Sequence, residues 1–215
     1  MELVARLNQT KYEVFRWRCE LSIPKKLGLA FAMALLTGLL AQLRFPLPWS
    51  PVPVTGQTLA VLLAGVLLGR WWGGASLAIY AILGAAGVPW FSGWASGFGA
   101  TYGYIIGFIL AALFLGHFTD RYIRSRSFLS MLALMLFSNF ILIYLPGLVW
   151  LSLWLNVLNG QAVSVITLLG MGALPFIAGD ITKAVIAAAI ARGVTPKAAY
   201  NGEVDKDKWA AWRLP

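Results

Sequence analysis

Charge is scarce in this sequence of 215 residues, and acidic charge is the scarcest. Only 12% of the residues are charged, with 17 Lys and Arg against 8 Asp and Glu. A water-soluble domain carries about 25% charged residues. Two long stretches, 71–115 and 127–179, contain no charged side chain at all. Because a soluble helix needs a polar face, stretches of this length predict burial in a lipid bilayer.

Cysteine and histidine are almost absent, with one of each. The single Cys19 excludes an internal disulfide. One cysteine and one histidine cannot supply the ligand shell of a zinc site. His117 is expected on the opposite side of the membrane from Ser96, so a serine nucleophile would have no base. Without a nucleotide-binding motif as well, we expect neither an enzyme nor a metal or cofactor site.

The net charge of +9 raises the question of a nucleic-acid partner. The basic residues do not form one block, however, but lie between apolar segments and at the two ends of the chain. This distribution is typical of membrane topology. We therefore expect lipid, and no nucleic acid, around this protein.

Six apolar segments predict an all-α integral membrane protein with six transmembrane helices and both termini cytoplasmic. The predicted spans are residues 27–43, 57–69, 71–88, 102–119, 128–145 and 173–192. They divide the chain into a basic cytoplasmic N-terminal segment, a six-helix domain and a polar cytoplasmic tail, with the bounds 1–26, 27–192 and 193–215. Fifteen of the seventeen Lys and Arg then fall in inner loops or at inner span ends, as the positive-inside rule requires.

Three stretches between these spans show no clear helical pattern. Four prolines fall within residues 46–53, and this density excludes a helix and predicts a loop. Glycine and tryptophan dominate residues 90–101, which we also expect to be a loop. Residues 148–173 are apolar but contain Asn156, Asn159 and several glycines, so we expect an interfacial or re-entrant segment there.

Asp180 and Lys183 are the most informative pair, because both lie within the last predicted span. A charge at membrane depth costs about 2.5–3.5 kcal/mol, and positions i and i+3 share one helical face. One interpretation is an anchor for a polar ligand, in which the carboxylate accepts N–H bonds and the ammonium pairs with a carboxylate. The other is an ion pair that ties neighbouring helices together. The functional bias of intramembrane charges favours the anchor.

Two further segments offer polar groups near the same side of the membrane. Thr55 and Gln57 follow the prolines and precede the second span, where they either bind a ligand or cap an interhelical turn. Aromatic residues and glycines are interleaved over 89–104. This composition suits either the wall of an apolar pocket or an aromatic belt at the membrane interface.

Small residues recur at four-residue spacing on the first span, at Ala30, Ala34 and Gly38. Such spacing lets another helix approach closely. That helix belongs either to a partner protein or to the same chain, and the pattern alone does not separate the two.

Several of these motifs together resemble the BioY family, the biotin-binding S components of energy-coupling-factor transporters. The resemblance covers roughly residues 27–192 and rests on motifs that occur in the same order. They are Pro51-Val-Pro-Val-Thr-Gly-Gln-Thr-Leu-Ala60, Leu62-Leu-Ala-Gly-Val-Leu-Leu-Gly69, Tyr80-Ala-Ile-Leu-Gly-Ala-Ala-Gly-Val-Pro89, Gly103-Tyr104 and Gly179-Asp180-Ile-Thr-Lys183-Ala184. It implies a substrate enclosed near the outer surface, under a loop between the first two helices.

The resemblance also implies roles for single residues. Asp180 and Lys183 match the last-helix residues that contact biotin, and Thr55 and Gln57 match the capping segment. The family's usual Gly-Pro-Thr-Gly-Gly-Tyr reads Gly-Ala-Thr-Tyr-Gly-Tyr over 99–104. The outer loop lacks the Asn or Arg of some members, so backbone groups or serines are expected to replace them. The expected ligand-binding set is Thr55, Gln57, Ser92, Ser96, Thr101, Tyr104, Asp180 and Lys183.

The resemblance implies a subunit in the plasma membrane of a prokaryote that captures biotin outside and delivers it inward. A coupling subunit and two ATPases would power transport, and Ala30, Ala34 and Gly38 would dock on the coupling subunit. Two alternatives remain open. One is an S component for another vitamin, and the other is a non-transporting membrane adaptor whose Asp180 and Lys183 only hold helices together.

Overall fold

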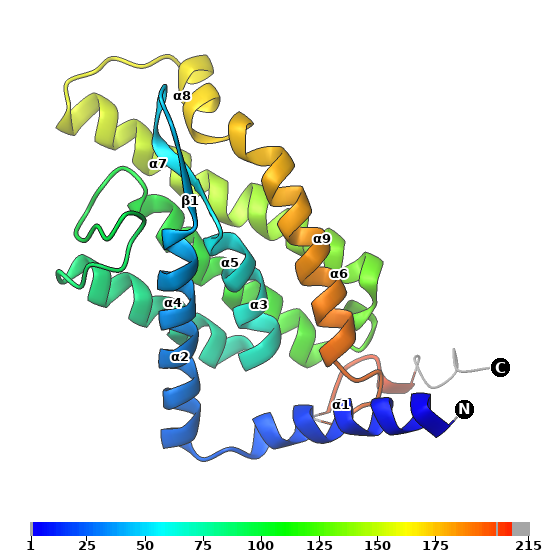
Figure 1. Ribbon diagram of the computed structural model, residues 1–215. Coiled ribbons are helices and arrows are strands. Elements are labelled where there is room, and N and C mark those ends of the chain that lie inside the picture. The colour runs from blue at the N-terminus through cyan, green and yellow to red at the C-terminus, as the bar shows by residue number, and fades with distance from the viewer. Residues whose placement is uncertain (1, 201, 208–215) are drawn as a thin grey trace.

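The computed structural model describes residues 2–200 and 202–207, and most of these residues are helical (Figure 1). The α-helices are α1 (Glu2–Glu20), α2 (Ile23–Gln42), α3 (Gln57–Leu68), α4 (Arg70–Ala85), α5 (Tyr102–Arg121), α6 (Phe128–Phe137), α7 (Tyr144–Leu153), α8 (Val165–Gly172) and α9 (Ile177–Val194). Shorter helical turns are η1 (Arg124–Arg126), η2 (Ser138–Ile143), η3 (Trp154–Leu158) and η4 (Leu174–Phe176). The strands are β1 (Arg44–Leu47) and β2 (Ser50–Thr55).

Four helical stretches are long and apolar enough to cross a membrane. They are Ile23–Gln42, Tyr102–Arg121, Phe128–Leu158 and Val165–Val194. Helix α3 is apolar but has only 12 residues, and α4 has 16. The protein is therefore a helical multi-pass membrane protein, while the count of six crossings stays a prediction.

Helix α5 lies at the centre of the bundle and packs against α3, α4 and α7. Helix α2 packs against α4, and α9 packs against α3 and α6. Glycines allow close approaches between α5 and its neighbours, as two examples show. A Cβ atom at Gly65 would collide with the backbone of Ala112, and one at Gly107 would collide with the backbone of Ile143.

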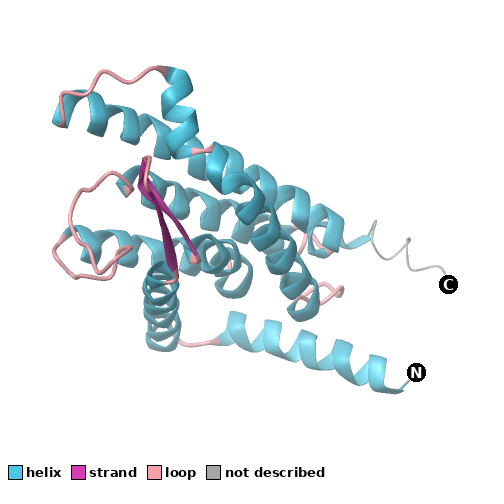
Figure 2. Ribbon diagram, turned by 45° about the horizontal axis from the view of Figure 1, so that its top comes forward, coloured by secondary structure: helices cyan, strands magenta, loops and turns pink. Residues whose placement is uncertain are grey.

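The two ends of the bundle carry different covers, and we name them the hairpin end and the α1 end (Figures 1 and 2). At the hairpin end, β1 and β2 pair antiparallel, with Arg44 opposite Thr55 and Leu47 opposite Ser50. At the α1 end, α1 lies across the ends of the other helices (Figure 1). The chain thus closes one end with a strand pair and the other with a surface helix.

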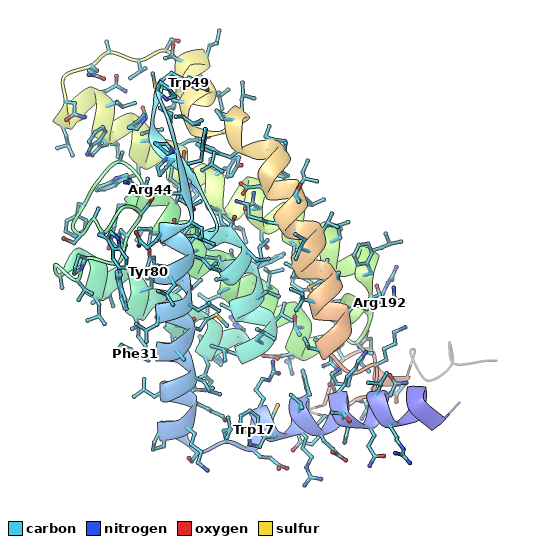
Figure 3. The ribbon with its side chains drawn as sticks, viewed as in Figure 1. Trp17, Phe31, Arg44, Trp49, Tyr80 and Arg192 are labelled. Carbon is cyan, nitrogen blue, oxygen red and sulfur yellow. The ribbon has the colours of Figure 1, made fainter. Side chains whose placement is uncertain are left out.

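The hairpin corrects the prediction of a loop for residues 46–53. Proline excludes a helix, but its fixed φ allows extended backbone, and its missing N–H is tolerated on the free edge of a strand. Each strand of a two-stranded sheet has such an edge. The hydroxyl of Ser50 donates a hydrogen bond to the Met171 carbonyl at 2.7 Å and so ties the hairpin to α8. Trp49 marks the tip of the hairpin beside α8 in Figure 3.

The prediction of an interfacial or re-entrant segment over 148–173 is wrong for its first part. The helix runs without a break from Phe128 to Leu158 and passes Pro146. Pro146 falls in the first turn of α7, directly after the π-helical turn η2, where a missing N–H is tolerated. Predicted boundaries also move by a few residues: α2 begins at Ile23 instead of 27, α4 ends at Ala85 instead of 88, and α9 is Ile177–Val194 instead of 173–192.

The small residues of α2 face the inside of this chain, which corrects their assignment to partner docking. Ala30 and Ala34 are both 0% exposed. A Cβ atom at Gly38 would approach Trp90 at 3.2 Å and Tyr80 at 3.6 Å, so this position is also used for packing within the chain. The exposed face of α2 carries large apolar side chains instead, such as Phe31, which is 44% exposed (Figure 3).

Candidate ligand-binding site

A pocket lies at the hairpin end, where the hairpin, α3, the loop 90–101, α5, α7 and α9 meet. Its apolar wall consists of Val52, Pro53, Ile105, Phe108, Ile143 and Phe176. The polar groups of the lining belong to Thr55, Gln57, Thr58, Ser92, Thr101, Tyr104, Tyr144, Asp180 and Lys183. A mostly apolar pocket with a few polar groups is typical of a small-molecule site.

The structure brings seven of the eight predicted ligand-binding residues into this pocket, since Thr55, Gln57, Ser92, Thr101, Tyr104, Asp180 and Lys183 all line it. Ser96 is exposed and does not line it, which corrects that part of the prediction. Three residues that the predicted set did not contain, Thr58, Asn139 and Tyr144, bind Asp180. The ligand-contact roles of all these residues stay proposals.

Asp180 is the most heavily bonded side chain of the site, and it is only 3% exposed. One carboxylate oxygen accepts from the Thr58 hydroxyl at 3.1 Å. The other accepts from the Asn139 amide at 3.0 Å and from the Tyr144 hydroxyl at 2.6 Å. These bonds tie α9 to α3, η2 and α7, and they offset the cost of burying the charge.

The π-helical turn explains why Asn139 and Tyr144 reach the same oxygen atom. The two residues are five positions apart, and a regular α-helix would point them in different directions. The turn η2 (Ser138–Ile143) follows the i→i+5 pattern, which brings positions five apart onto one face. A lone Asn in an apolar span is the signal that the sequence offered, whereas the π turn itself leaves no comparable pattern.

Lys183 completes the polar side of the pocket. Its ammonium group lies 2.5 Å from an Asp180 oxygen and donates to the Thr55 carbonyl at 2.9 Å. Asp180 and Lys183 therefore form the ion pair that the structural interpretation predicts. A cavity lies beside this pair, as the ligand-anchor interpretation requires. An ammonium group has three N–H donors, so one is left to face a ligand oxygen.

Gln57 and Thr55 form the start of a hydrogen-bonded chain across the hairpin end. The Thr55 hydroxyl donates to the Gln57 side-chain oxygen at 3.0 Å, and the Gln57 amide donates to the Tyr80 hydroxyl at 2.8 Å. The Tyr80 hydroxyl donates to the Trp90 carbonyl at 3.2 Å. Gln57 is thus oriented by α4 and by the loop 90–101 before any ligand arrives.

Ser92 is the one residue of the lining whose buried hydroxyl has no hydrogen-bond partner within residues 2–200 and 202–207. Buried polar groups are nearly always paired, and an orphan calls for a specific explanation. A polar ligand group in the pocket would supply the missing partner. The hydroxyl of Tyr104, by contrast, donates to the Gly172 carbonyl at 2.7 Å, so its proton is already used within the protein.

Within the same described residues, no three His, Cys, Asp or Glu side chains lie close enough together to hold a metal ion.

The fold and the pocket define a membrane-embedded binding protein for a small molecule that carries both apolar and polar groups. The polar groups of the lining comprise one ammonium group, one amide, several hydroxyls and one carboxylate whose oxygens are already hydrogen-bonded within the protein.

The family model described as "BioY family" matches residues 10–200. This chain therefore belongs to the BioY family. A probable biotin transporter of Methanothermobacter thermautotrophicus is 55% identical over 71% of this chain and 100% of its own length. A probable biotin transporter of Pyrococcus horikoshii is 36% identical over 78% of this chain and 94% of its own length.

A solved structure supports the same relationship. It is the crystal structure of the S-component for biotin from an ECF-type ABC transporter, and it superimposes with a TM-score of 0.69. The sequences are 26% identical, and the match covers 80% of this chain and 93% of that chain. The resemblance expected from the sequence motifs is thereby confirmed at the level of the family.

Proposed function

We propose that this protein is the substrate-binding membrane subunit of a biotin transporter, with the pocket at the hairpin end as its biotin site. The geometry that supports this proposal is the Lys183 ammonium group, with two partners for its three N–H donors, beside an apolar cavity. The same cavity carries the Ser92 hydroxyl, which has no partner among the described residues. The biotin transporters among its relatives agree with it.

The chemistry of biotin matches this pocket. Its thiophane ring suits the apolar wall formed by residues such as Ile105, Phe108 and Phe176. Its ureido group offers two N–H donors and one carbonyl acceptor, and its tail ends in a carboxylate. Both oxygen-bearing ends suit an ammonium donor. Lys183 therefore binds either the carboxylate or the ureido carbonyl, and the hydroxyls serve the remaining polar groups.

The pocket is small for biotin as it stands. Its volume is about 60 Å³, whereas pockets for drug-sized ligands measure roughly 300–1,000 Å³, so some of its lining must move to admit the ligand. The hairpin contributes Val52, Pro53 and Thr55 to the lining and is held to α8 by one Ser50 bond. We infer that it opens for the ligand and closes over it, in keeping with the capping role that the family resemblance implies.

The transport direction and the partners complete the proposal. The hairpin end faces the outside of a prokaryotic plasma membrane, six segments cross it, and both termini are cytoplasmic. Partner subunits, a coupling protein and two ATPases, supply the energy. The matched S-component for biotin comes from an ECF-type ABC transporter, and this origin supports such a partnership.

Biotin binding to the purified protein tests the proposal directly, with wild type beside Lys183→Met. Methionine keeps the length of the side chain but removes its charge and its donors. The loss is about 2–5 kcal/mol if the ligand group is the carboxylate and about 1.5–3 kcal/mol if it is the neutral ureido carbonyl, so we expect at least about a tenfold loss of biotin affinity. Asp180 keeps its bonds from Thr58, Asn139 and Tyr144 in this variant and should stay in place.

Biotin methyl ester shows which end of the ligand Lys183 holds. If Lys183 binds the carboxylate, the ester and Lys183→Met lose overlapping interactions, and the two losses do not add. If Lys183 binds the ureido carbonyl, the losses add. Unchanged biotin affinity in Lys183→Met would contradict the proposed site. Displacement of a bound ligand by another vitamin, but not by biotin, would favour a different substrate.

A further inference from the structure

A second cavity lies at the α1 end, on the side of the bundle where α5 and α6 diverge. These helices follow each other in the chain and are joined through η1, yet the backbone of α5 packs closely against η2 and not against α6, so that α5 and α6 meet only through long side chains. The gap forms a groove of about 1090 Å³. It shares no lining residue with the pocket at the hairpin end.

Aromatic rings form one wall of this groove. Phe114, Phe118 and Tyr122 follow each other at four-residue spacing on α5 and its last turn. The ring centroids of Phe114 and Phe118 are 4.7 Å apart, and the rings of Phe118 and Tyr122 are stacked at 5.6 Å. Phe137 of α6 lies 5.3 Å from Phe114 and closes the deep end. Such an apolar channel suits a hydrocarbon chain better than a polar segment.

Small and polar residues form the other wall and the mouth. Ala133 leaves room along α6, and nearer the chain connection the Ser127 hydroxyl donates to the Ser130 hydroxyl at 3.0 Å. Arg124 lines the groove, is exposed, and forms no ion pair within the part of the chain that the structure describes. The mouth therefore combines a cation with two hydroxyls.

One carboxylate also lines the mouth, that of Asp205. Its two oxygens accept from the backbone N–H groups of Ile123 at 2.8 Å and of Arg124 at 2.9 Å. Both oxygens of Asp205 are bonded to backbone N–H groups, and among the described residues no ion pair joins Asp205 to the Arg124 guanidinium. Asp205 keeps its negative charge, so the attraction for an anion is local to the exposed Arg124 guanidinium and the neighbouring hydroxyls of Ser127 and Ser130.

We propose that this groove binds an anionic phospholipid, with one acyl chain between α5 and α6 and the phosphate at Arg124, Ser127 and Ser130. Charge complementarity selects the head group, and the aromatic wall selects the chain. The mouth lies at the same end as α1, whose exposed Arg16 and Trp17 suit a lipid head-group region. A free phosphate ion would leave the apolar part of the groove unfilled.

Native mass spectrometry of the full-length protein in detergent tests this site. We titrate phosphatidylglycerol and phosphatidylcholine with identical acyl chains and expect tighter binding of phosphatidylglycerol. Arg124→Ala should weaken phosphatidylglycerol binding about fivefold, since one basic residue near a membrane surface contributes about that factor. It should also remove the preference over phosphatidylcholine. Lys25→Ala removes an exposed positive charge at the start of α2 and should leave both affinities unchanged.

A groove-filling pair of variants tests the acyl-chain site separately. Ala133→Trp places an indole in the groove and should weaken binding of both lipids about tenfold or more. Leu129→Trp is its control, because Leu129 is 75% exposed on the same helix and does not line the groove. The melting temperature and the biotin affinity of both variants should match wild type. The proposal is overturned if Arg124→Ala keeps the lipid preference, or if the two tryptophan variants bind phosphatidylglycerol equally.

Discussion

A single carboxylate organises the polar side of the proposed biotin pocket. Asp180 receives bonds from Thr58, Asn139, Tyr144 and Lys183. Two oxygens that already hold four donors have little capacity left for a ligand N–H. We therefore infer that Asp180 mainly positions Lys183 and the neighbouring hydroxyls, which refines the sequence-based expectation that both charges contact biotin directly.

The sequence could predict Asp180 and Lys183 because charge at membrane depth is rare and costly. The sequence did not identify the residues that hydrogen-bond to Asp180. Asn139 and Tyr144 meet Asp180 only because η2 departs from regular α-helical geometry. Ser92 and Ser96 looked equivalent in the sequence, and the path of the loop 90–101 turns one into the pocket and the other toward solvent.

Ser92→Ala should separate ligand binding from stability. The Ser92 hydroxyl is buried without a partner among the described residues, so its removal should leave the melting temperature equal or higher. If biotin supplies the partner, the variant loses one hydrogen bond of about 0.5–1.5 kcal/mol. The biotin affinity, measured by equilibrium binding, should then fall roughly two- to tenfold.

Two matched serines serve as controls for this experiment. Ser96→Ala alters an exposed serine of the same loop and should change neither the biotin affinity nor the melting temperature. Ser76→Ala removes a buried hydroxyl that donates to the Gly73 carbonyl at 2.7 Å, away from the pocket lining. It should lower the melting temperature and leave the affinity unchanged. An affinity of Ser92→Ala equal to that of Ser96→Ala would remove Ser92 from the site.

Whole helices could be predicted from the sequence where an apolar segment is long and uninterrupted. The predictions failed where prolines lie within or beside a segment that forms regular structure. The span at 102–119 matches α5 closely because no proline interrupts it. The hairpin was missed because proline-rich sequence indicates a loop unless the strand partner is known. The predicted helix stopped at 145 because Pro146-Gly147 normally ends a helix, whereas in the structure the helix continues past this proline directly after a π turn.

The α1 end is held together by an element that the apolar pattern did not reveal. The tail folds back so that Glu203 pairs with Arg126 at 2.7 Å, with both side chains fully buried. The guanidinium of Arg126 also lies 4.5 Å from the Phe15 ring of α1. Burial lowers the pKa of the Arg126 guanidinium. Burial alone would raise the pKa of Glu203, but the bonds from Arg126 and from backbone N–H groups outweigh it and lower that pKa.

Glu203→Leu should destabilise the protein strongly, because it leaves the Arg126 charge buried and unpaired. Breaking such a pair costs about 3–5 kcal/mol, which should appear as a large fall in the melting temperature in detergent. Glu20→Leu breaks the exposed pair with Arg16, whose side chains are 51% and 56% exposed, and should have a much smaller effect.

The difference in stability between wild type and Glu203→Leu should depend on pH because the pKa of Glu203 is lowered in the folded protein. The ionised Glu203 stabilises the fold fully above the unfolded glutamate pKa of about 4.3, and this stabilisation is lost as the pH falls through the lower folded pKa. The gap in melting temperature between wild type and Glu203→Leu should therefore be constant near neutral pH and shrink below about pH 4. A gap that stays constant into strong acid would contradict the role of the ionised pair.

On the scale of the whole molecule, both terminal segments lie at the α1 end. The Tyr200 hydroxyl donates to the Glu20 carboxylate at 2.8 Å, and the Lys11 ammonium donates to the Arg192 carbonyl at 3.4 Å. These contacts support the proposal that both segments lie on the same side of the membrane, which requires an even number of crossings. Four long helical stretches with α3 and α4 as two shorter crossings would satisfy this condition.

The positive-inside rule predicts that the α1 end faces the cytoplasm, and a single natural cysteine makes this orientation measurable. Cys19 is the only cysteine and lies at the α1 end. A membrane-impermeant maleimide should therefore leave wild type unlabelled in intact cells and label it once the membrane is opened.

In a Cys19→Ser background, Asn159→Cys places a thiol in an exposed loop near α8 and should be labelled in intact cells. Lys206→Cys in the same background, exposed in the tail, should behave like wild type. Labelling of Lys206→Cys, but not of Asn159→Cys, from outside would invert the topology and place the biotin pocket on the wrong side for uptake.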